Sequence, residues 1–450
     1  MFKRSHRNIP FKEYKKTLAL SLPVIVAQAG QIMVGIVDNI MIGHLGCTEL
    51  AAASFTNTLI TLVVIFGMGF SFALTPVVGQ RMASRDYKFI GMALKNGLLS
   101  NLIMGVLLVA VLGLLSICIP YMNQPESIIG TSRKFMYLLM LSVIPMQLFY
   151  AYKQFFEGVG NTRLSMIIML VANIINTIGN YLFMYGKFGC PEMGLYGAAV
   201  GTIISRVFMV VVAAICFYRM KSFRRYLIGF NKAVCNIFGV KRLYKLGVPL
   251  GGQLVMEASA FGLCTIMIGW INEVSLAAHQ IVLSLSTIGF MVYQGIGSAT
   301  TIRVSHLIGE NNYEKIKTIK TVSIQIMFIY CLLIIFLFVG GRNILPLLFS
   351  SDKEVLLLAS SMLVMCGVFQ ISDGAQIIIA GVLRGFADAK IPAVITFFAY
   401  FVIALPVSYY CAFNLKIGAV GMWYGFPVGL SIAYLLYYLR YKRLLKMSLA

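Results

Sequence analysis

The chain has 450 residues, of which 59% are hydrophobic and only 12% are charged. Soluble domains carry roughly 45–50% apolar and about 25% charged residues, so this composition excludes a soluble protein and indicates one embedded in a bilayer. The net charge of +22 suggests a nucleic-acid partner at first sight. The basic residues instead gather in connections on one side of the predicted membrane, which accounts for the positive charge. No nucleic-acid binding is therefore expected.

Twelve segments are long and apolar enough to cross roughly 30 Å of hydrocarbon as helices, which takes about 20 residues each. The spans predicted in the N-terminal half lie near residues 17–42, 50–78, 91–119, 134–156, 163–186 and 194–218. Those predicted in the C-terminal half lie near residues 243–270, 276–301, 318–340, 355–381, 391–413 and 418–440. The sequence therefore predicts an all-α polytopic membrane protein.

The distribution of basic residues predicts the orientation of these spans. Most of the 37 Lys and Arg residues fall in the N-terminal segment, in alternate connections and in the C-terminal tail. The opposite connections carry only Arg133, Lys134, Lys187, Arg342, Lys353 and Lys416. Because cytoplasmic loops are enriched in Lys and Arg, we expect both termini in the cytoplasm and the protein in a bacterial inner (plasma) membrane.

The two halves of the chain resemble each other. Ile40–Ala52 aligns with Ile266–Ala278 at a shift of 226, with seven of thirteen positions identical. Two further matches lie at nearly the same shift, Glu157–Arg163 with Arg384–Lys390 and Gly194–Gly201 with Gly418–Gly425. Because each half has an even number of spans, the halves should form two parallel six-helix bundles related by pseudo-two-fold symmetry. Transporters with such repeats rock two bundles around a site between them, which favours a carrier.

This repeat predicts the domain organisation. The expected parts are a cytoplasmic N-terminal segment at 1–16, an N-lobe at 17–218, a basic cytoplasmic linker at 219–242, a C-lobe at 243–440 and a cytoplasmic tail at 441–450. The nine cysteines and four histidines form no CxxC or HxxxH pattern, so neither a disulfide framework nor a zinc site is expected.

Three carboxylates lie well inside apolar spans: Asp38, Glu257 and Asp373. Each costs roughly 2.5–3.5 kcal/mol at the centre of a bilayer, so we expect these groups to face a wet cavity, to pair, to bind a cation or to be protonated. Polar residues that share helical faces with the acids, or that line the fifth span, indicate a cavity in each bundle or one between them. The candidates are Gln31, Asn176, Asn180, Gln253 and Gln370, although interhelical hydrogen bonding is an alternative for the asparagines.

Aromatic residues close to the acids add a clue to the ligand. Tyr293 and Phe369 are candidates to line the cavity, whereas most other aromatic residues are assigned to packing. Carboxylates beside aromatic faces suit an organic cation, through Coulomb attraction and cation–π contact. Arg206 also lies within a span and could either pair with a carboxylate or extend toward the membrane surface.

The acids do not follow the repeat. Asp38 aligns with Cys264, and Glu257 aligns with Gln31. The scaffold is therefore symmetric while the charges are not. We expect the two bundles to have different tasks, such as proton handling in one and cation coordination in the other.

Six segments carry a likeness to a known family: Leu22–Gly46, Phe156–Arg163, Tyr185–Thr202, Pro249–Phe261, Ala277–Ile281 and Leu383–Pro392. In combination they resemble the multidrug and toxic compound extrusion (MATE) transporters of the NorM-like branch. The resemblance implies twelve helices in two lobes, and export of cationic drugs and dyes against inward Na⁺ or H⁺, without a cofactor.

The resemblance also implies roles for particular residues. Glu257 and Asp373, with Tyr293 beside them, would take the coupling cation in the C-lobe, with Na⁺ as the candidate metal. Asp38 would form a proton or substrate site in the N-lobe, together with Asn176, Asn180 and Thr202. This chain departs from the family at Phe369, where NorM-type members tend to have a tyrosine one turn before the C-lobe aspartate.

We therefore expect a secondary active antiporter for small organic cations, acting as a monomer in membrane lipid, and not an enzyme. The alternative is a flippase of the same superfamily for lipid-linked oligosaccharides or precursors. Pyrophosphate substrates would require a basic cavity, whereas Arg206 is the only basic residue within a span. The physiological substrate and the choice between Na⁺ and H⁺ stay open at this stage.

Overall fold

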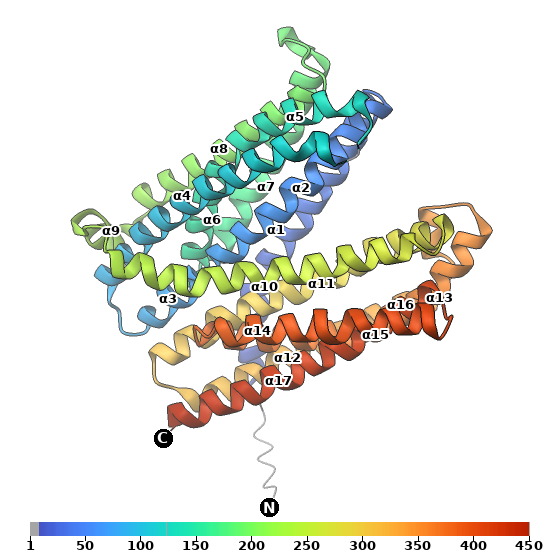
Figure 1. Cartoon of the computed structure of the whole chain (residues 1–450). Helices are drawn as coiled ribbons and strands as arrows, with labels where there is room; N and C mark the ends of the chain where they lie inside the picture. Colours follow the sequence, from blue (N-terminus) through green and yellow to red (C-terminus); the bar gives the residue numbers. More distant parts are fainter. Residues whose placement is uncertain (1–8, 123, 450) are drawn as a thin grey trace, which may run out of the picture. The chain divides into compact units, whose positions relative to one another are not determined.

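The computed structural model describes residues 9–122 and 124–449, and within those ranges it is helical without any β-strand (Figure 1). The helices of the first half are α1 (Phe11–Gly43), α2 (Cys47–Ser71), α3 (Leu74–Met82), α4 (Tyr87–Cys118), α5 (Glu126–Leu141), α6 (Val143–Gly158), α7 (Thr162–Tyr185), α8 (Leu195–Arg219) and α9 (Arg224–Lys232). Those of the second half are α10 (Ile237–Gly269), α11 (Glu273–Gly309), α12 (Tyr313–Gly340), α13 (Lys353–Gly385), α14 (Lys390–Phe397), α15 (Leu405–Tyr409), α16 (Ala419–Met422) and α17 (Gly425–Leu449).

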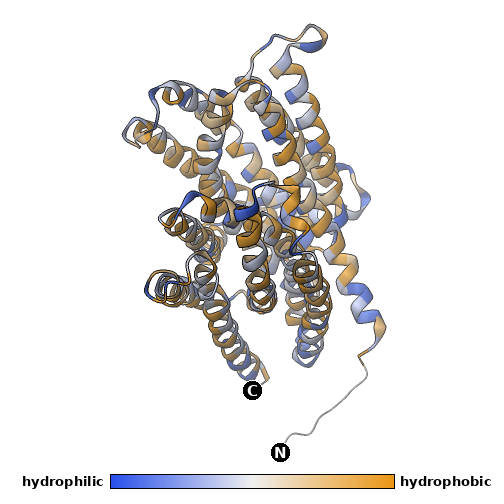
Figure 2. Ribbon diagram, turned by 90° about the vertical axis from the view of Figure 1, so that its right-hand side faces the viewer, coloured by the Kyte–Doolittle hydropathy of each residue, from blue (hydrophilic) through white to orange (hydrophobic). Residues whose placement is uncertain are grey.

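Twelve helical stretches in the described part of the chain are long and apolar enough to cross a membrane, which confirms the predicted number and order of spans. The second, fourth, eleventh and twelfth spans each combine consecutive short elements, such as α2 with α3. In Figure 2 the hydrophobic colour follows the long helices and the hydrophilic colour gathers mainly near their ends. This is the distribution that a bilayer solvent requires.

The observed helices extend beyond the predicted spans, most clearly in α11, which runs to Gly309, and in α17, which runs to Leu449. Hydropathy marks only the apolar centre of a span, whereas polar caps define where the helix begins. Asp86 caps α4 by accepting a hydrogen bond from the backbone N–H of Phe89 at 3.1 Å. Residues 1–8 of the predicted N-terminal segment and Ala450 of the predicted tail lie outside the described residues.

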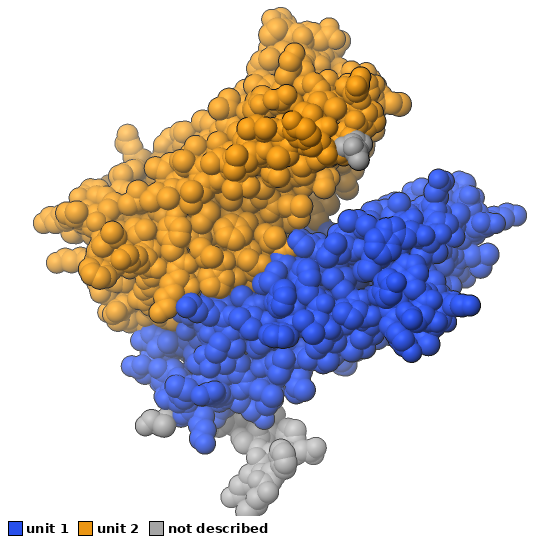
Figure 3. Space-filling model, in the orientation of Figure 1, with its two compact units in different colours: residues 1–25, 256–450 blue, residues 26–255 orange. Residues whose placement is uncertain are grey.

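The chain divides into two compact units, coloured separately in Figure 3. Unit 1 contains residues 1–25 and 256–450, and unit 2 contains residues 26–255. This division differs from the predicted lobes, because α1 and α10 each contribute residues to both units. The predicted linker at 219–242 falls entirely within unit 2, where most of it is helical.

The predicted linker is anchored on unit 2 through α9. Methyl groups on Gly91 of α4 or Gly229 of α9 would overlap the backbone of the other helix, so these two glycines permit the close approach of the two helices. Lys95 Nζ also donates a hydrogen bond to the carbonyl of Ala233 at 2.7 Å. The basic stretch therefore packs on unit 2 through α9.

The internal repeat is visible in individual hydrogen bonds. Thr75 Oγ1 donates to the carbonyl of Gln154 at 3.1 Å in unit 2, and Thr301 Oγ1 donates to the carbonyl of Gly381 at 2.9 Å in unit 1. Among the described residues, five that are not glycine have positive φ, and two of them, Arg85 at 53° and Asn311 at 54°, are equivalent at the shift of 226. The repeat thus preserves turns and helix contacts as well as sequence.

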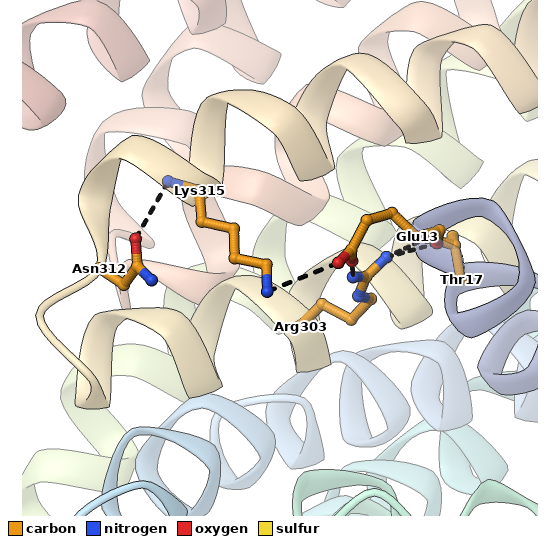
Figure 4. A network of polar contacts seen from close by, with 5 residues as sticks. All are labelled: Glu13, Thr17, Arg303, Asn312 and Lys315. Carbon is orange, nitrogen blue, oxygen red and sulfur yellow. Dashed lines mark hydrogen bonds and ion pairs between the residues drawn. The ribbon is translucent and has the colours of Figure 1, made fainter. Parts of the chain in front are cut away.

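An ion-pair cluster fixes the first turn of α1 within unit 1 (Figure 4). The guanidinium of Arg303 pairs with the carboxylate of Glu13, and it donates to Thr17 Oγ1 at 2.6 Å. Lys315 Nζ lies 3.5 Å from the other carboxylate oxygen, while its backbone N–H donates to Asn312 Oδ1 at 3.3 Å. Glu13 is only 7% exposed, so the two cations balance a carboxylate that is largely removed from water.

We predict that Glu13→Gln destabilises the protein by about 3 kcal/mol, because Arg303 would keep its largely buried charge without a counter-charge. Thermal unfolding of the purified protein in detergent would measure this loss. Glu314→Gln is the matched control, because the Glu314–Lys317 pair is exposed at 69% and 48% and should contribute less than about 1 kcal/mol. Equal effects of the two substitutions would contradict the assigned role of the cluster.

Candidate functional site

A polar cluster joins α1, α7 and α8 in unit 2. Asn180 Nδ2 donates to Asp38 Oδ1 at 2.7 Å and to Asn176 Oδ1 at 3.4 Å, and Asn176 Nδ2 donates to Thr202 Oγ1 at 3.3 Å. Both asparagines are buried, whereas Asp38 and Thr202 are partly buried. The structure therefore brings together the four residues that the sequence placed in the N-terminal half of the site.

Two glycines make this cluster possible. A methyl group on Gly179 of α7 would lie 3.1 Å from the Cα of Gly201 on α8. A methyl group on Gly201 would overlap the side-chain oxygen of Asn180 and would lie 2.8 Å from its backbone nitrogen. Close approach of α7 and α8 thus sets the position of the amide that contacts Asp38. Small residues at helix contacts serve this purpose in membrane proteins.

Arg206 extends the cluster by one helical turn. It follows Thr202 by four residues on α8, and its Nη1 donates to Ser142 Oγ at 2.6 Å. Its charge interacts with the carboxylate of Asp38 and with Tyr150. The hydrogen bond of Arg206 goes to Ser142, and no ion pair with Asp38 forms among the described residues, so both interpretations of Arg206 left open by the sequence stay predictions.

A second polar cluster lies in unit 1 and begins at Glu257 of α10. Gln376 Nε2 on α13 donates to Glu257 Oε1 at 3.3 Å, and the hydroxyl of Tyr400 donates to Gln376 Oε1 at 3.3 Å. Gln376 and Tyr400 are 1% and 2% exposed. A continuous chain of side-chain hydrogen bonds therefore leads from the interior of the unit to the carboxylate.

Asp373 lies three residues before Gln376 on the same helix and is 5% exposed. Its Oδ2 is buried and, among the described residues, has no hydrogen bond partner; the same is true of the hydroxyl of Tyr293 on α11. The ring of Tyr293 packs beside the next residue on α13, since a methyl group on Gly374 would lie 3.1 Å from its Cε1, and the charge of Asp373 acts on Tyr293. The negative charge of Glu257 also acts on Asp373. The unpartnered Asp373 oxygen and Tyr293 hydroxyl thus lie in the buried part of a polar region whose charge is influenced by Glu257.

Tyr400 is the residue of this region that the sequence did not single out. It lies in a π-helical turn, Phe398–Ala404, six residues before Pro406. Proline has no backbone N–H and disturbs the preceding turn of a helix, and π-helical turns are frequent at functional sites. Pro406 was therefore the one available signal, but it does not indicate which of the neighbouring aromatic residues turns inward.

The other predicted lining residues have varied positions. Gln370 Nε2 donates to Ser286 Oγ at 3.3 Å, which links α13 to α11 in unit 1. Gln31 and Gln253 both belong to unit 2, where Gln31 is exposed and Gln253 is buried. Neither therefore shares a unit with Glu257.

Phe369 has the surroundings of a packing residue. It is 2% exposed, and its ring makes edge contacts with Phe261, Trp423 and Phe426 at centroid distances of 5.9, 5.8 and 6.2 Å. These rings belong to the aromatic core of unit 1. A role for Phe369 in lining a cavity stays a prediction.

These features define a polytopic α-helical membrane protein of the carrier type, with acid-containing polar clusters in both of its units. The chain belongs to the MatE family, which it matches over residues 23–182 and 249–410. It is a multi-pass membrane protein, and the resemblance seen in the sequence is confirmed.

Curated relatives match nearly the whole chain. The multidrug resistance protein NorM of Vibrio cholerae serotype O1 is 31% identical over 435 residues, which cover 94% of each chain. The probable multidrug resistance protein NorM of Agrobacterium fabrum is 30% identical over 444 residues, covering 97% of this chain and 95% of that protein.

Solved structures support the fold. The outward-facing conformation of a multidrug resistance MATE family transporter superimposes with a TM-score of 0.89 at 18% identity, covering 97% of this chain and 96% of that one. The Vibrio cholerae MATE transporter VcmN in its bent form gives a TM-score of 0.87 at 20% identity, covering 97% and 98%.

We predict that Gly201→Ala costs about 1–3 kcal/mol of stability, because the added methyl group would collide with Asn180. Thermal unfolding in detergent checks this value. The matched control is Gly35→Ala on α1 of the same unit, where a methyl group would meet no atom within 4 Å. A normal unfolding temperature for Gly201→Ala would show that the contact between α7 and α8 does not position Asn180.

Proposed function

We propose that this protein is a secondary active multidrug efflux antiporter that exports small organic cations in exchange for Na⁺ or H⁺ by alternating access. The observation that carries the proposal is the pair of carboxylates in unit 1, Glu257 and Asp373, with a buried Asp373 oxygen that lacks a hydrogen bond partner among the described residues. The names of the relatives, multidrug resistance proteins, support drugs as the substrate class.

Electrostatic repulsion supports a cation-coupling role for unit 1. Two like charges close together in a poorly solvated region repel strongly, and a cation or a proton placed with them relieves that repulsion. Na⁺ is a hard cation that favours oxygen ligands, and the oxygens of Glu257, Asp373 and Tyr293 are of that kind. Binding or release of the ion then changes the charge of the region, which is the event that an antiporter couples to a change of conformation.

The cluster in unit 2 supports a different task for Asp38. The amide of Asn180 fixes one carboxylate oxygen, and the charge of Arg206 acts on the same group. An exported cation or a proton that reaches Asp38 would compete with this guanidinium for the carboxylate. Because the positive charge of Arg206 can balance Asp38 again after the ligand leaves, this competition favours release of the ligand.

Topology and assembly are part of the proposal. The concentration of basic residues at alternate connections and in both terminal segments supports cytoplasmic termini in a bacterial inner membrane. We propose a monomer as the working unit, since the candidate clusters are each complete within one chain.

Asp373→Asn should abolish ion-coupled export while the protein remains folded, because the amide keeps the shape of the carboxylate but cannot provide its charge. The measurement is efflux of a fluorescent cationic dye from proteoliposomes, at fixed pH, with an inward Na⁺ gradient imposed and then removed. Asp86→Asn is the control, since it changes the same functional group at a helix cap where the equivalent residue of the other half is already Asn312.

The outcomes of this assay separate the alternatives. Na⁺-driven efflux that is lost in Asp373→Asn but kept in Asp86→Asn supports Na⁺ coupling in unit 1. Efflux that ignores Na⁺ but follows an imposed pH step assigns coupling to protons. Full activity of Asp373→Asn contradicts the proposed role of this residue, and no efflux under either gradient would favour the flippase.

Asp38→Asn should weaken binding of the organic cation by about 10-fold or more, since loss of a charge-assisted interaction costs roughly 1.5–3 kcal/mol. Equilibrium binding of the dye to purified protein measures this change, with displacement by Na⁺ as a second readout. Displacement by Na⁺ should persist in Asp38→Asn and disappear in Asp373→Asn. If both variants lose both properties, the assignment of separate tasks to the two units is wrong.

A further inference from the structure

An open, basic surface cavity lies at the beginning of α12 and the end of α17, on helices that carry none of Asp38, Glu257 and Asp373. It has a volume of about 400 Å³ and belongs to unit 1. Its lining consists of three lysines and two leucines: Lys317, Lys442, Leu445, Lys446 and Leu449.

A fourth ammonium group lies beside this cavity. Lys320 Nζ is 5.1 Å from the ring centre of Tyr438 and 5.5 Å from that of Tyr441. Lys442 Nζ lies 4.8 Å from the same Tyr438 ring. Two cations therefore share one aromatic ring, and their charges interact with each other. An aromatic face attracts a cation but does not cancel its charge.

Carboxylates do not balance this group of lysines. Lys317 pairs with Glu314 at 2.8 Å. Lys320, Lys442 and Lys446 take part in none of the ion pairs formed among residues 9–122 and 124–449. Like charges held close together repel unless an anion lies between them, so the arrangement favours a negatively charged ligand.

The cavity also has an apolar side. Leu445 is 7% exposed and packs in a core cluster with Tyr437 and Tyr441. Leu449, one turn further along α17, is 51% exposed and leaves an apolar surface next to the lysines. Lysines beside an exposed leucine at the end of a membrane-spanning helix are typical of the layer where lipid headgroups meet hydrocarbon.

We propose that this cavity binds the phosphodiester headgroup of an anionic membrane phospholipid, with the lysines around the phosphate and an acyl chain along the exposed Leu449. Lysine ammonium groups bind phosphate oxygens as point charges and donate hydrogen bonds from several directions. Free phosphate would use the lysines but not the leucines. The site is independent of the proposed export function and of the choice between Na⁺ and H⁺.

The test uses the full-length protein in detergent, titrated with phosphatidylglycerol, with phosphatidylcholine or with inorganic phosphate. Native mass spectrometry counts the bound lipids. We expect phosphatidylglycerol to be retained at least fivefold better than phosphatidylcholine, and Lys442→Gln/Lys446→Gln to remove that preference. Both lysines are exposed, so the variant should unfold at the same temperature as the natural protein in lipid-free detergent.

The matched control is Arg342→Gln/Lys353→Gln, which removes two exposed positive charges from the same unit at connections predicted on the opposite side of the membrane. It should keep the preference for phosphatidylglycerol. Equal losses in the two double variants would overturn the proposal in favour of general attraction by net charge. Retention of phosphatidylglycerol by Lys442→Gln/Lys446→Gln, or binding of inorganic phosphate as tight as that of the lipid, would also overturn it.

Discussion

The free energy of placing a carboxylate inside a bilayer is the constraint on which the polar parts of this structure depend. Asp38 and Glu257 meet it in the same way, since each accepts a hydrogen bond from a side-chain amide on another helix, Asn180 or Gln376. An amide donor compensates part of the lost hydration without supplying a positive charge. At Asp38 the charge of Arg206 also acts on the carboxylate, so a mobile cation that reaches it would compete with that guanidinium. Glu13 shows the opposite solution, because Arg303 and Lys315 neutralise it where α1 begins.

The internal repeat preserves the packing positions of the two units but not the positions of their acids. Thr75 and Thr301 make equivalent hydrogen bonds to the carbonyls of neighbouring helices in their own units. Gly158 and Gly385 lie at equivalent positions, where a methyl group would come within 3.1 Å of the Thr75 carbonyl and 3.2 Å of the Thr301 carbonyl. These packing positions tolerate little change in either half, because interiors are close-packed. The acids do not follow the repeat, so the two units share these packing positions but differ in their electrostatic properties.

Much of this architecture could be predicted from the sequence, because the signals were local and repeated. Hydropathy located all twelve spans, and helical periodicity placed Asn176 and Asn180 on the face that meets Asp38. The division of α1 and α10 between the two units could not be predicted, since both helices are continuous in hydropathy. The inward position of Tyr400 could not be predicted from the sequence for a related reason. A π-helical turn changes which residues share a face, so helical periodicity assigns them incorrectly.

The helices that carry Asp38 and Glu257 retain glycines for which packing offers no reason. Around Gly35 on α1, and around Gly252 and Gly262 on α10, a methyl group would meet no atom within 4 Å. Alanine would stabilise the helix by roughly 0.5–1 kcal/mol at each such position. Glycine at these three positions therefore lowers the stability of the helical conformation in the two helices that contribute residues to both units. It follows that α1 and α10 bend more readily at these glycines than helices with alanine there would.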